Sequence, residues 1–182
     1  MALTFAATLL LPLQYAVLIG MAFSILLNAV HQANNLVVRE WILAPGLFPE
    51  ERPAPKALPS GQLTMLQIYG SLFFAGAKSL EDLLPAPGEA TRAVVALALR
   101  GTPEIGSTFI AVLRRYADAL KARDCRLMLV GVDPTVRAQL ARTGLLRQIG
   151  EDFVFVATPQ LGSAMNKAAA AARDWIENPT KH

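Results

Sequence analysis

The chain begins with a long stretch without charge: no Asp, Glu, Lys or Arg occurs in Met1–Val38. Within it, the run Leu3–Val30 exceeds the ~20 apolar residues that cross the hydrocarbon core of a bilayer. Pro12 would remove a hydrogen bond from a helix interior, so we expect two helical pieces that meet there, the longer one covering Gln14–Asn28. The pattern predicts a membrane-embedded segment over residues 1–35.

Two alternatives to a membrane segment agree less well with these residues. A secretory signal peptide has a basic beginning and a shorter apolar core, whereas the first residues here, Met-Ala-Leu-Thr, carry no basic side chain. A buried hairpin of a soluble domain should show a polar stripe, and this run has none. Because the apolar run begins almost at Met1, we expect the chain to be a truncated piece, or the end, of a larger membrane protein.

The residues after this segment favour a cytoplasmic location for the rest of the chain. Positive side chains accumulate on the cytoplasmic side of a membrane span, and Arg39, Arg52 and Lys56 come first here, although acidic residues accompany them. The free thiol of Cys125 agrees with a reducing compartment.

A change of composition separates the apolar segment from the remainder of the chain. The run LVVREWIL around Val38 alternates enough to be a short strand. Five prolines then fall between Ala44 and Pro59, which indicates a linker or a chain of turns. We therefore divide the remainder into a short strand and linker over residues 36–60 and a folded domain over residues 61–182.

Beyond the linker, apolar runs of strand length alternate with segments of helical periodicity. The expected strands are Leu63–Tyr69 and Ser71–Ala75, joined as a hairpin at Gly70-Ser71, then Ala93–Leu99, Arg126–Val132 and Phe153–Ala157. The expected helices are Lys78–Leu84, Ser107–Ala122, Pro134–Thr143 and Leu161–Ile176. This alternation predicts an α/β fold, a mixed sheet whose central strands are parallel and covered by helices.

Composition and charge exclude several functional classes. Hydrophobic residues make up 53% of the 182 residues and charged residues 17%, which excludes wholesale disorder. One cysteine and two distant histidines, His31 and His182, exclude a disulfide framework and leave too few residues for a zinc site. The net charge is +3, but the basic residues are interleaved with acids, so we expect no nucleic acid partner.

The sequence contains no catalytic constellation. No Ser, His and acid set can be assembled from the two histidines, and no phosphate-binding loop of the Gly-x-x-x-x-Gly-Lys-Ser/Thr type occurs. The neighbouring carboxylates Glu81-Asp82 and Glu151-Asp152 lie in short polar segments typical of solvent-exposed loops. We therefore expect no enzymatic activity, no cofactor and no metal.

Several segments together resemble one known family. The runs IYGSLFFAGAKSLEDLL, VVALALRGTPEIGSTFIAVLRRYADALKARDCRLMLVGVDPTVRAQLARTGL and IGEDFVFVA resemble a STAS domain of the kind attached to SulP sulfate and anion transporters. Upstream, LLLPLQYAVLIGMAFSILLNAV followed by VVREWI resembles the last membrane helices of such carriers. The resemblance extends from about Phe5 to Trp175.

The resemblance implies a fold, a partner and a location. STAS domains resemble bacterial anti-sigma factor antagonists in fold, so a mixed sheet with packed helices is expected. The implied function is that of the C-terminal part of a sulfate or inorganic anion transporter in the inner or plasma membrane. Its cytoplasmic STAS domain would regulate or assemble the carrier through contacts with the membrane domain, and a homodimer is left open.

The resemblance also points to a loop before the helix at Ser107. In the antagonist family this loop carries Asp-Ser, then Ser or Thr, then Gly, and its Ser is phosphorylated. Here Ser107 and Thr108 are retained, whereas Gly106 replaces the Asp and Phe109 replaces the Gly. The lost carboxylate would have capped the helix and placed negative charge at its positive end, which disfavours phosphorylation by a dedicated kinase.

Two roles for this loop remain open. Ser107 or Thr108 could simply cap the helix. Alternatively, Gly106, Ser107 and Thr108, with Arg100 beside them, could form a phosphorylation or anion-binding loop that takes a nucleotide or a regulatory protein. In the second case the chain would be a membrane-tethered signalling or binding module of the antagonist type rather than a transporter component.

Overall fold

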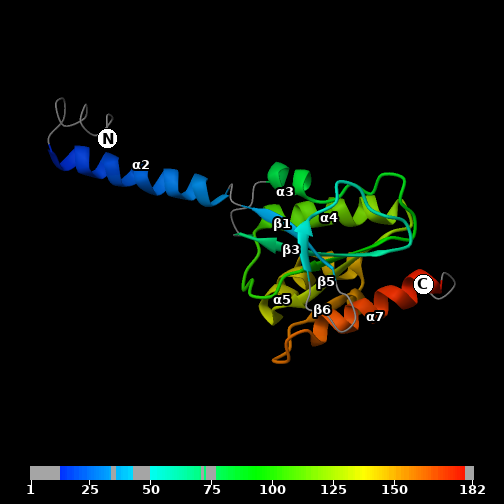
Figure 1. Ribbon diagram of the computed structural model, residues 1–182. Coiled ribbons are helices and arrows are strands. Elements are labelled where there is room, and N and C mark those ends of the chain that lie inside the picture. The colour runs from blue at the N-terminus through cyan, green and yellow to red at the C-terminus, as the bar shows by residue number, and fades with distance from the viewer. Residues whose placement is uncertain (1–12, 34–35, 43–49, 71, 73–76, 179–182) are drawn as a thin grey trace.

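The computed structural model describes residues 13–33, 36–42, 50–70, 72 and 77–178 (Figure 1). Within them, one six-stranded sheet has the order β2-β1-β3-β4-β5-β6. The strands are β1 (Val37–Ile42), β2 (Glu50–Pro53), β3 (Leu63–Tyr69), β4 (Val94–Ala98), β5 (Arg126–Val132) and β6 (Val154–Val156). The α-helices are α2 (Leu13–Ala33), α3 (Ala77–Leu83), α4 (Ser107–Lys121), α5 (Pro134–Arg142), α6 (Leu145–Ile149) and α7 (Ser163–Glu177), and the 3-10 helix η1 is Glu151–Phe153.

The sheet is mixed, as the strand and helix pattern predicts. Strands β3, β4, β5 and β6 run parallel to one another, whereas β1 pairs antiparallel with both β2 and β3. Each parallel step contains a helix, because parallel neighbours need a crossover connection. The carboxyl ends of β3 to β6 therefore meet at one edge of the sheet, and β1 begins at that same edge.

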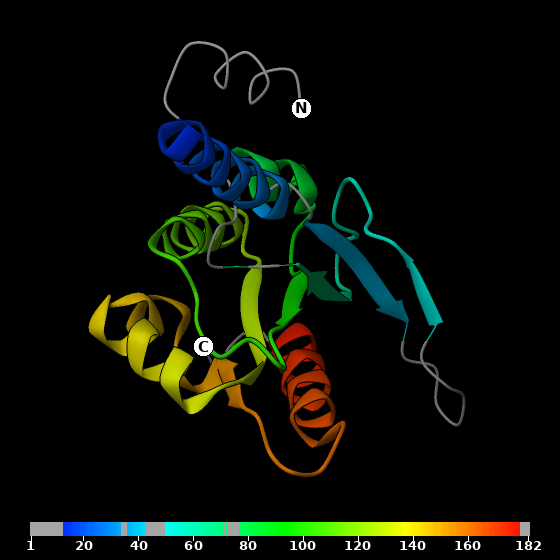
Figure 2. The same ribbon diagram turned by 90° about the vertical axis from the view of Figure 1, so that its left-hand side faces the viewer.

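Helices cover the two faces of the sheet unequally. One face packs against α3, α4, α5 and α6 in a large apolar cluster, and the opposite face packs against α7 alone in a smaller one (Figure 2). All five residues of β4 are buried, which explains why that strand reads as a continuous apolar run. The alanines of α7 let this helix approach the second face closely.

The helix boundaries follow the predicted end signals. Asp133 caps α5, since its side-chain Oδ1 accepts a 2.8 Å hydrogen bond from the Thr135 N–H, and Pro134 occupies the first helical position. Gly144 follows the helix in a left-handed conformation, with φ of 78°. These signals are confirmed, but the short helix α6 directly after Gly144 was not predicted.

Two sequence predictions between the linker and β4 are corrected. Residues Glu50–Pro53 pair with β1 as the outermost strand, although this region was assigned to a linker. Pro53 is tolerated there because an edge strand can place a residue without an N–H on its unpaired side. The predicted hairpin is wrong, because β1 and β4 occupy the two edges of β3; apart from Leu72, its second strand, Ser71–Ala75, lies outside the described residues.

The N-terminal helix α2 differs from the rest of the molecule. It extends away from the sheet (Figure 1), and large apolar side chains are exposed along it. No helix in the described part of the chain meets the length and hydropathy expected of a membrane span. The membrane segment over residues 1–35 thus remains a prediction, and its first piece, up to Pro12, lies outside the described residues.

Candidate functional site at the Ser107 loop

The loop singled out by the sequence connects the end of β4 to the start of α4. Backbone contacts fix its last residues: the Gly106 N–H donates to the Leu72 carbonyl at 3.2 Å, and the Ile105 N–H donates to Gln139 Oε1 of α5 at 3.3 Å. Ile105 itself is buried. The loop is therefore held against the domain at the edge where the parallel strands end.

The hydroxyl groups of the loop do not cap the helix. Gly106 is the N-cap residue of α4, with φ of −75° and ψ of 157°, and no side chain makes a capping hydrogen bond. Ser107 is the first helical residue, and both Ser107 and Thr108 are exposed. The interpretation of Ser107 or Thr108 as a simple cap is therefore wrong, because the extended Gly106 takes the capping position.

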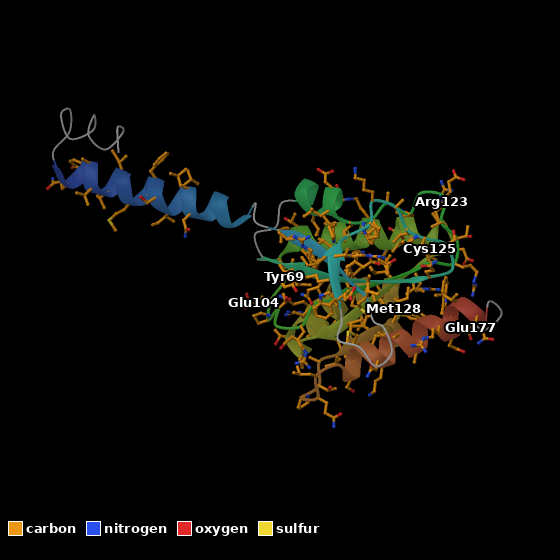
Figure 3. All side chains as sticks on the ribbon, viewed as in Figure 1. Tyr69, Glu104, Arg123, Cys125, Met128 and Glu177 are labelled. Atoms are coloured by element: carbon orange, nitrogen blue, oxygen red, sulfur yellow. The ribbon has the colours of Figure 1, made fainter. Side chains whose placement is uncertain are left out.

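The electrostatic setting of Ser107 suits a negative group. The first turn of α4 contains no acidic residue, so nothing on the helix compensates the positive end of its dipole. The nearest acid earlier in the loop is the exposed Glu104, which lies on the side of the domain nearer α2 (Figure 3). A phosphate at an exposed helix start gains about 0.3–1 kcal/mol from the dipole alone.

Arg100 lies at the same edge but is directed elsewhere. Its Nη2 donates to the Thr158 carbonyl in the connection between β6 and α7. Its Cβ lies close to Gly131, where a methyl group in place of the glycine hydrogen would come within 3.1 Å of it. The structure gives no hydrogen bond between Arg100 and Ser107 in the described ranges, and the role of Arg100 in neutralising an anion at this loop stays a prediction.

The aromatic residue that replaces the family's Gly has a structural role. Phe109 is fully buried and packs in the large cluster beneath α4. The ring of Phe109 is therefore part of the hydrophobic core.

One cluster of chemically distinctive side chains was missed by sequence reasoning. The guanidinium carbon of Arg92 lies 4.7 Å from the centre of the Trp175 ring, and that of Arg126 lies 5.5 Å from the same ring and 4.8 Å from the ring of Phe153. Arg92 also donates to the carbonyls of Trp175 and of Ile176, the latter at 2.7 Å. The cluster fastens α7 to the sheet.

Burial shifts the pKa values of two groups in this region. Desolvation lowers the pKa of Arg126 and raises that of the nearby Cys125 thiol. No sequence signal marks this cluster, because its members come from four separate elements or connections. Its cation–π contacts are typical of a structural fastening rather than of a reactive site.

Comparisons with known proteins agree with this arrangement. The sequence model of the STAS domain family matches residues 54–160. YvdB of Bacillus subtilis (strain 168), provisionally named a sulfate transporter, is 27% identical over 157 residues, which are 85% of this chain and 28% of YvdB. The chain therefore spans little more than a quarter of that relative.

Solved structures show the same fold. A sulfate transporter family protein from Wolinella succinogenes is 29% identical and has a TM-score of 0.53, covering 67% of this chain and 93% of its own. The murine Solute Carrier 26 family member A9 anion transporter, in its inward-facing state, has a TM-score of 0.66 at 16% identity over 94% of this chain and 28% of its own. The family match covers more than half of the residues, and the strand order and crossover helices accompany it. The chain belongs to the STAS domain family, in the form found in sulfate transporter family proteins.

Proposed function

We propose that this chain is the C-terminal part of a sulfate or other inorganic anion transporter. Its STAS domain lies in the cytoplasm, is not an enzyme, and regulates or assembles the carrier through protein contacts. The relatives named above support the transporter context, because their names describe sulfate or anion transport. In this proposal the segment to which α2 belongs is embedded in the inner or plasma membrane, against the carrier's membrane domain.

The observation that carries this proposal is the apolar surface of α2. Side chains on successive turns and on all sides of the helix are at least 40% exposed: Tyr15, Val17, Leu18, Ile19, Met21, Phe23, Ile25, Leu26 and Leu27. A continuous apolar surface of this kind is not stable in water and marks an interaction surface. Lipid and neighbouring membrane helices would bury it.

The connection between α2 and the sheet indicates which edge of the domain meets the partner. Only four residue steps separate Ala33 from Val37, a reach of at most about 14 Å. Val37 pairs with Tyr69, and both are more than 40% exposed. Figure 3 places Tyr69 at the end of the domain nearer α2 and Arg123 at the far end. The edge formed by Val37 and Tyr69 is thus the proposed contact with the membrane domain.

The test is anion uptake by the full-length transporter that contains this chain. Val37→Asp combined with Tyr69→Asp places two charges on the proposed contact, and we expect uptake of labelled sulfate to fall at least fivefold. Lys121→Asp combined with Arg123→Asp, an even larger change of charge at the far end of the domain, is the control and should leave uptake unchanged. Equal uptake by both double variants, at equal protein levels and equal thermal stability, would refute the proposed contact.

A second candidate function is favoured by Ser107. Its exposed hydroxyl makes no capping bond, which leaves it accessible to a kinase, a nucleotide or a regulatory protein. The chain would then act as a membrane-tethered signalling module, with or without a homodimer. Phosphate on Ser107 in protein from its native host, with no anion uptake by the full-length protein that contains this chain, would favour this function over the transporter role.

A further inference from the structure

The face of the sheet that carries α7 is only partly covered. Helix α7 packs against β3, β4, β5 and β6, whereas β1 and β2 extend past it (Figure 2). Trp41 of β1 lies in this uncovered region and lines two hollows beside α7, one of about 440 Å³ and one of about 200 Å³. The two hollows differ in the residues that line them.

The smaller hollow is mainly apolar. Trp41, Ala98, Val130, Ala164 and Met165 line it, together with Leu161, which is 82% exposed at the rim. An apolar cavity of about 150 Å³ accepts a benzene-sized molecule, so this hollow can take one ring or a short hydrocarbon chain. Trp41 also borders the larger hollow, which leaves room for a longer chain to continue past the indole.

Two glycines line the smaller hollow near Arg100. Gly131 and Gly162 both line it and both have left-handed φ values, 69° and 83°. A side chain at Gly131 would be strained and would press against Arg100 at 3.1 Å from its Cβ. The missing side chain at Gly131 therefore lets the Arg100 side chain begin directly against the backbone of β5, at the edge of the smaller hollow.

Arg100 gives the smaller hollow a positive charge. It is the single charged residue among the described residues that line it. A guanidinium has five N–H donors, and the Thr158 carbonyl accepts a hydrogen bond from only one of its nitrogens, Nη2. The remaining donors have the planar fork that matches a carboxylate. In the larger hollow, by contrast, Arg52 is paired with Glu40, and Arg173 is accompanied by Glu177.

We propose that the smaller hollow binds a small amphipathic carboxylate. Its hydrocarbon or aromatic body lies against Trp41 and Met165, and its carboxylate meets the guanidinium of Arg100. A few polar groups placed around an apolar pocket are typical of small-molecule sites. This site is separate from the Ser107 loop, since Arg100 is directed toward the connection before α7. It does not depend on which anion, if any, a transporter carries.

The test uses the full chain in phosphatidylcholine nanodiscs, with octanoate as the probe. Octanoate should change the tryptophan fluorescence in a saturable way, and Trp41→Phe should remove that change, because the other tryptophan, Trp175, is buried beneath Arg92. Octylamine, with the same chain and the opposite charge, should bind at least tenfold more weakly. Empty nanodiscs correct for partition of either probe into lipid.

Variants of Arg100 measure how much its charge contributes to octanoate binding, apart from the apolar lining of the hollow. Arg100→Gln should weaken octanoate binding at least tenfold, whereas Arg100→Lys, which keeps the charge without the fork, should fall between. Arg147→Gln, the same change at an exposed arginine of α6, should leave binding unchanged. The proposal is overturned by an absence of saturable binding, by equal binding of octylamine, or by unchanged binding in a folded Arg100→Gln. If Arg100→Gln fails to fold, the comparison of the two probes decides.

Discussion

Helices α2 and α4 contain many apolar residues, yet they use them in opposite ways. In α4 the apolar side chains form one stripe, and Phe109, Val112, Leu113, Tyr116 and Leu120 are all buried under it. The other side of α4 carries charges that reach neighbouring elements, such as Arg115 with Glu81 and Arg114 with the Thr143 carbonyl. In α2 apolar residues occur all round, and nearly all of the large ones are exposed.

The difference teaches where each helix finds its partner. The polar side of α4 faces water and its apolar side packs against the domain, so the chain itself buries the apolar residues of this helix. Helix α2 has no such stripe, and in our proposal lipid and neighbouring membrane helices cover its surface. The amphipathic helix α4 is therefore a core element, whereas the more uniformly apolar α2 exposes an apolar surface.

The largest expected effect comes from emptying the core under α4. Phe109→Ala should lower the free energy of unfolding by about 3–5 kcal/mol through lost burial and the cavity it leaves. Phe23→Ala makes the same change on α2, where the ring is 44% exposed, and should leave unfolding of the sheet domain unaltered. Urea denaturation followed by circular dichroism measures both. Equal losses from the two variants would remove the distinction between the helices.

Helix α7 provides an intermediate case, because it is fastened by ring and cation contacts. Arg92→Ala removes two hydrogen bonds to the end of α7 and the cation–π contact with Trp175, which should cost about 1–3 kcal/mol. Arg147→Ala, which removes an exposed arginine of α6, serves as the control. A cost below about 0.5 kcal/mol for Arg92→Ala would show that packing of the alanines alone holds the helix.

Alkaline pH should weaken the domain through groups buried near α4. Burial raises the pKa of Cys125, and it also raises the pKa of Tyr116, whose hydroxyl donates to the Pro85 carbonyl at 2.8 Å. A raised folded-state pKa gives stability that is complete below the unfolded value and is lost as pH rises. The melting temperature should therefore fall above about pH 8.5, the ordinary thiol pKa. Cys125 should cause the first part of this fall, because its ordinary pKa is lower than that of Tyr116.

Single variants show which part of this pH dependence comes from Cys125 and which from Tyr116. Between pH 8 and 9.5 the free energy of unfolding should fall by up to about 1 kcal/mol less in Cys125→Ala than in the wild type. Tyr116→Phe should reduce the fall in unfolding free energy only above about pH 10. Thermal melts across this range measure both. An identical pH profile in the wild type and in Cys125→Ala would contradict the assignment to the buried thiol.

The smallest expected effect is at the loop. Since Gly106 caps α4 and Ser107 does not, Ser107→Ala should change stability by less than about 0.5 kcal/mol. A true cap would cost about 0.5–2 kcal/mol when replaced. Denaturation of this variant beside the wild type distinguishes the two, and a loss above about 1 kcal/mol would restore the capping role.

The elements with clear periodicity could be predicted from the sequence. The stripe of α4, the apolar run of β4 and the end signals of α5 each act locally, so their elements were found with boundaries correct to within one or two residues. The STAS resemblance also followed from the order of these segments. These features need no knowledge of which residues meet across the fold.

The remaining features depend on contacts between distant segments. Strand β2 was missed because its charged, proline-containing sequence has no strand pattern, and only pairing with β1 makes it a strand. The hollow beside Trp41 combines β1, β3, β4, β5, α7 and two connections, and the fastening of Trp175 joins residues more than 80 positions apart. At the loop, the chemistry of Ser107 was identified, but its failure to cap depends on the backbone of Gly106.

The central claim is that the surface of α2 is buried by surroundings that the chain itself does not provide. In a Cys125→Ser background, Ile25→Cys places a thiol at a position of α2 that is 68% exposed in the isolated chain, and Arg123→Cys places one on the exposed far end of the domain. A membrane-impermeant maleimide is added to vesicles with the cytoplasmic side outward. The account predicts rapid labelling of Arg123→Cys and protection of Ile25→Cys until the membrane is dissolved and the protein denatured. Labelling of Ile25→Cys at the rate of Arg123→Cys in intact vesicles would contradict it.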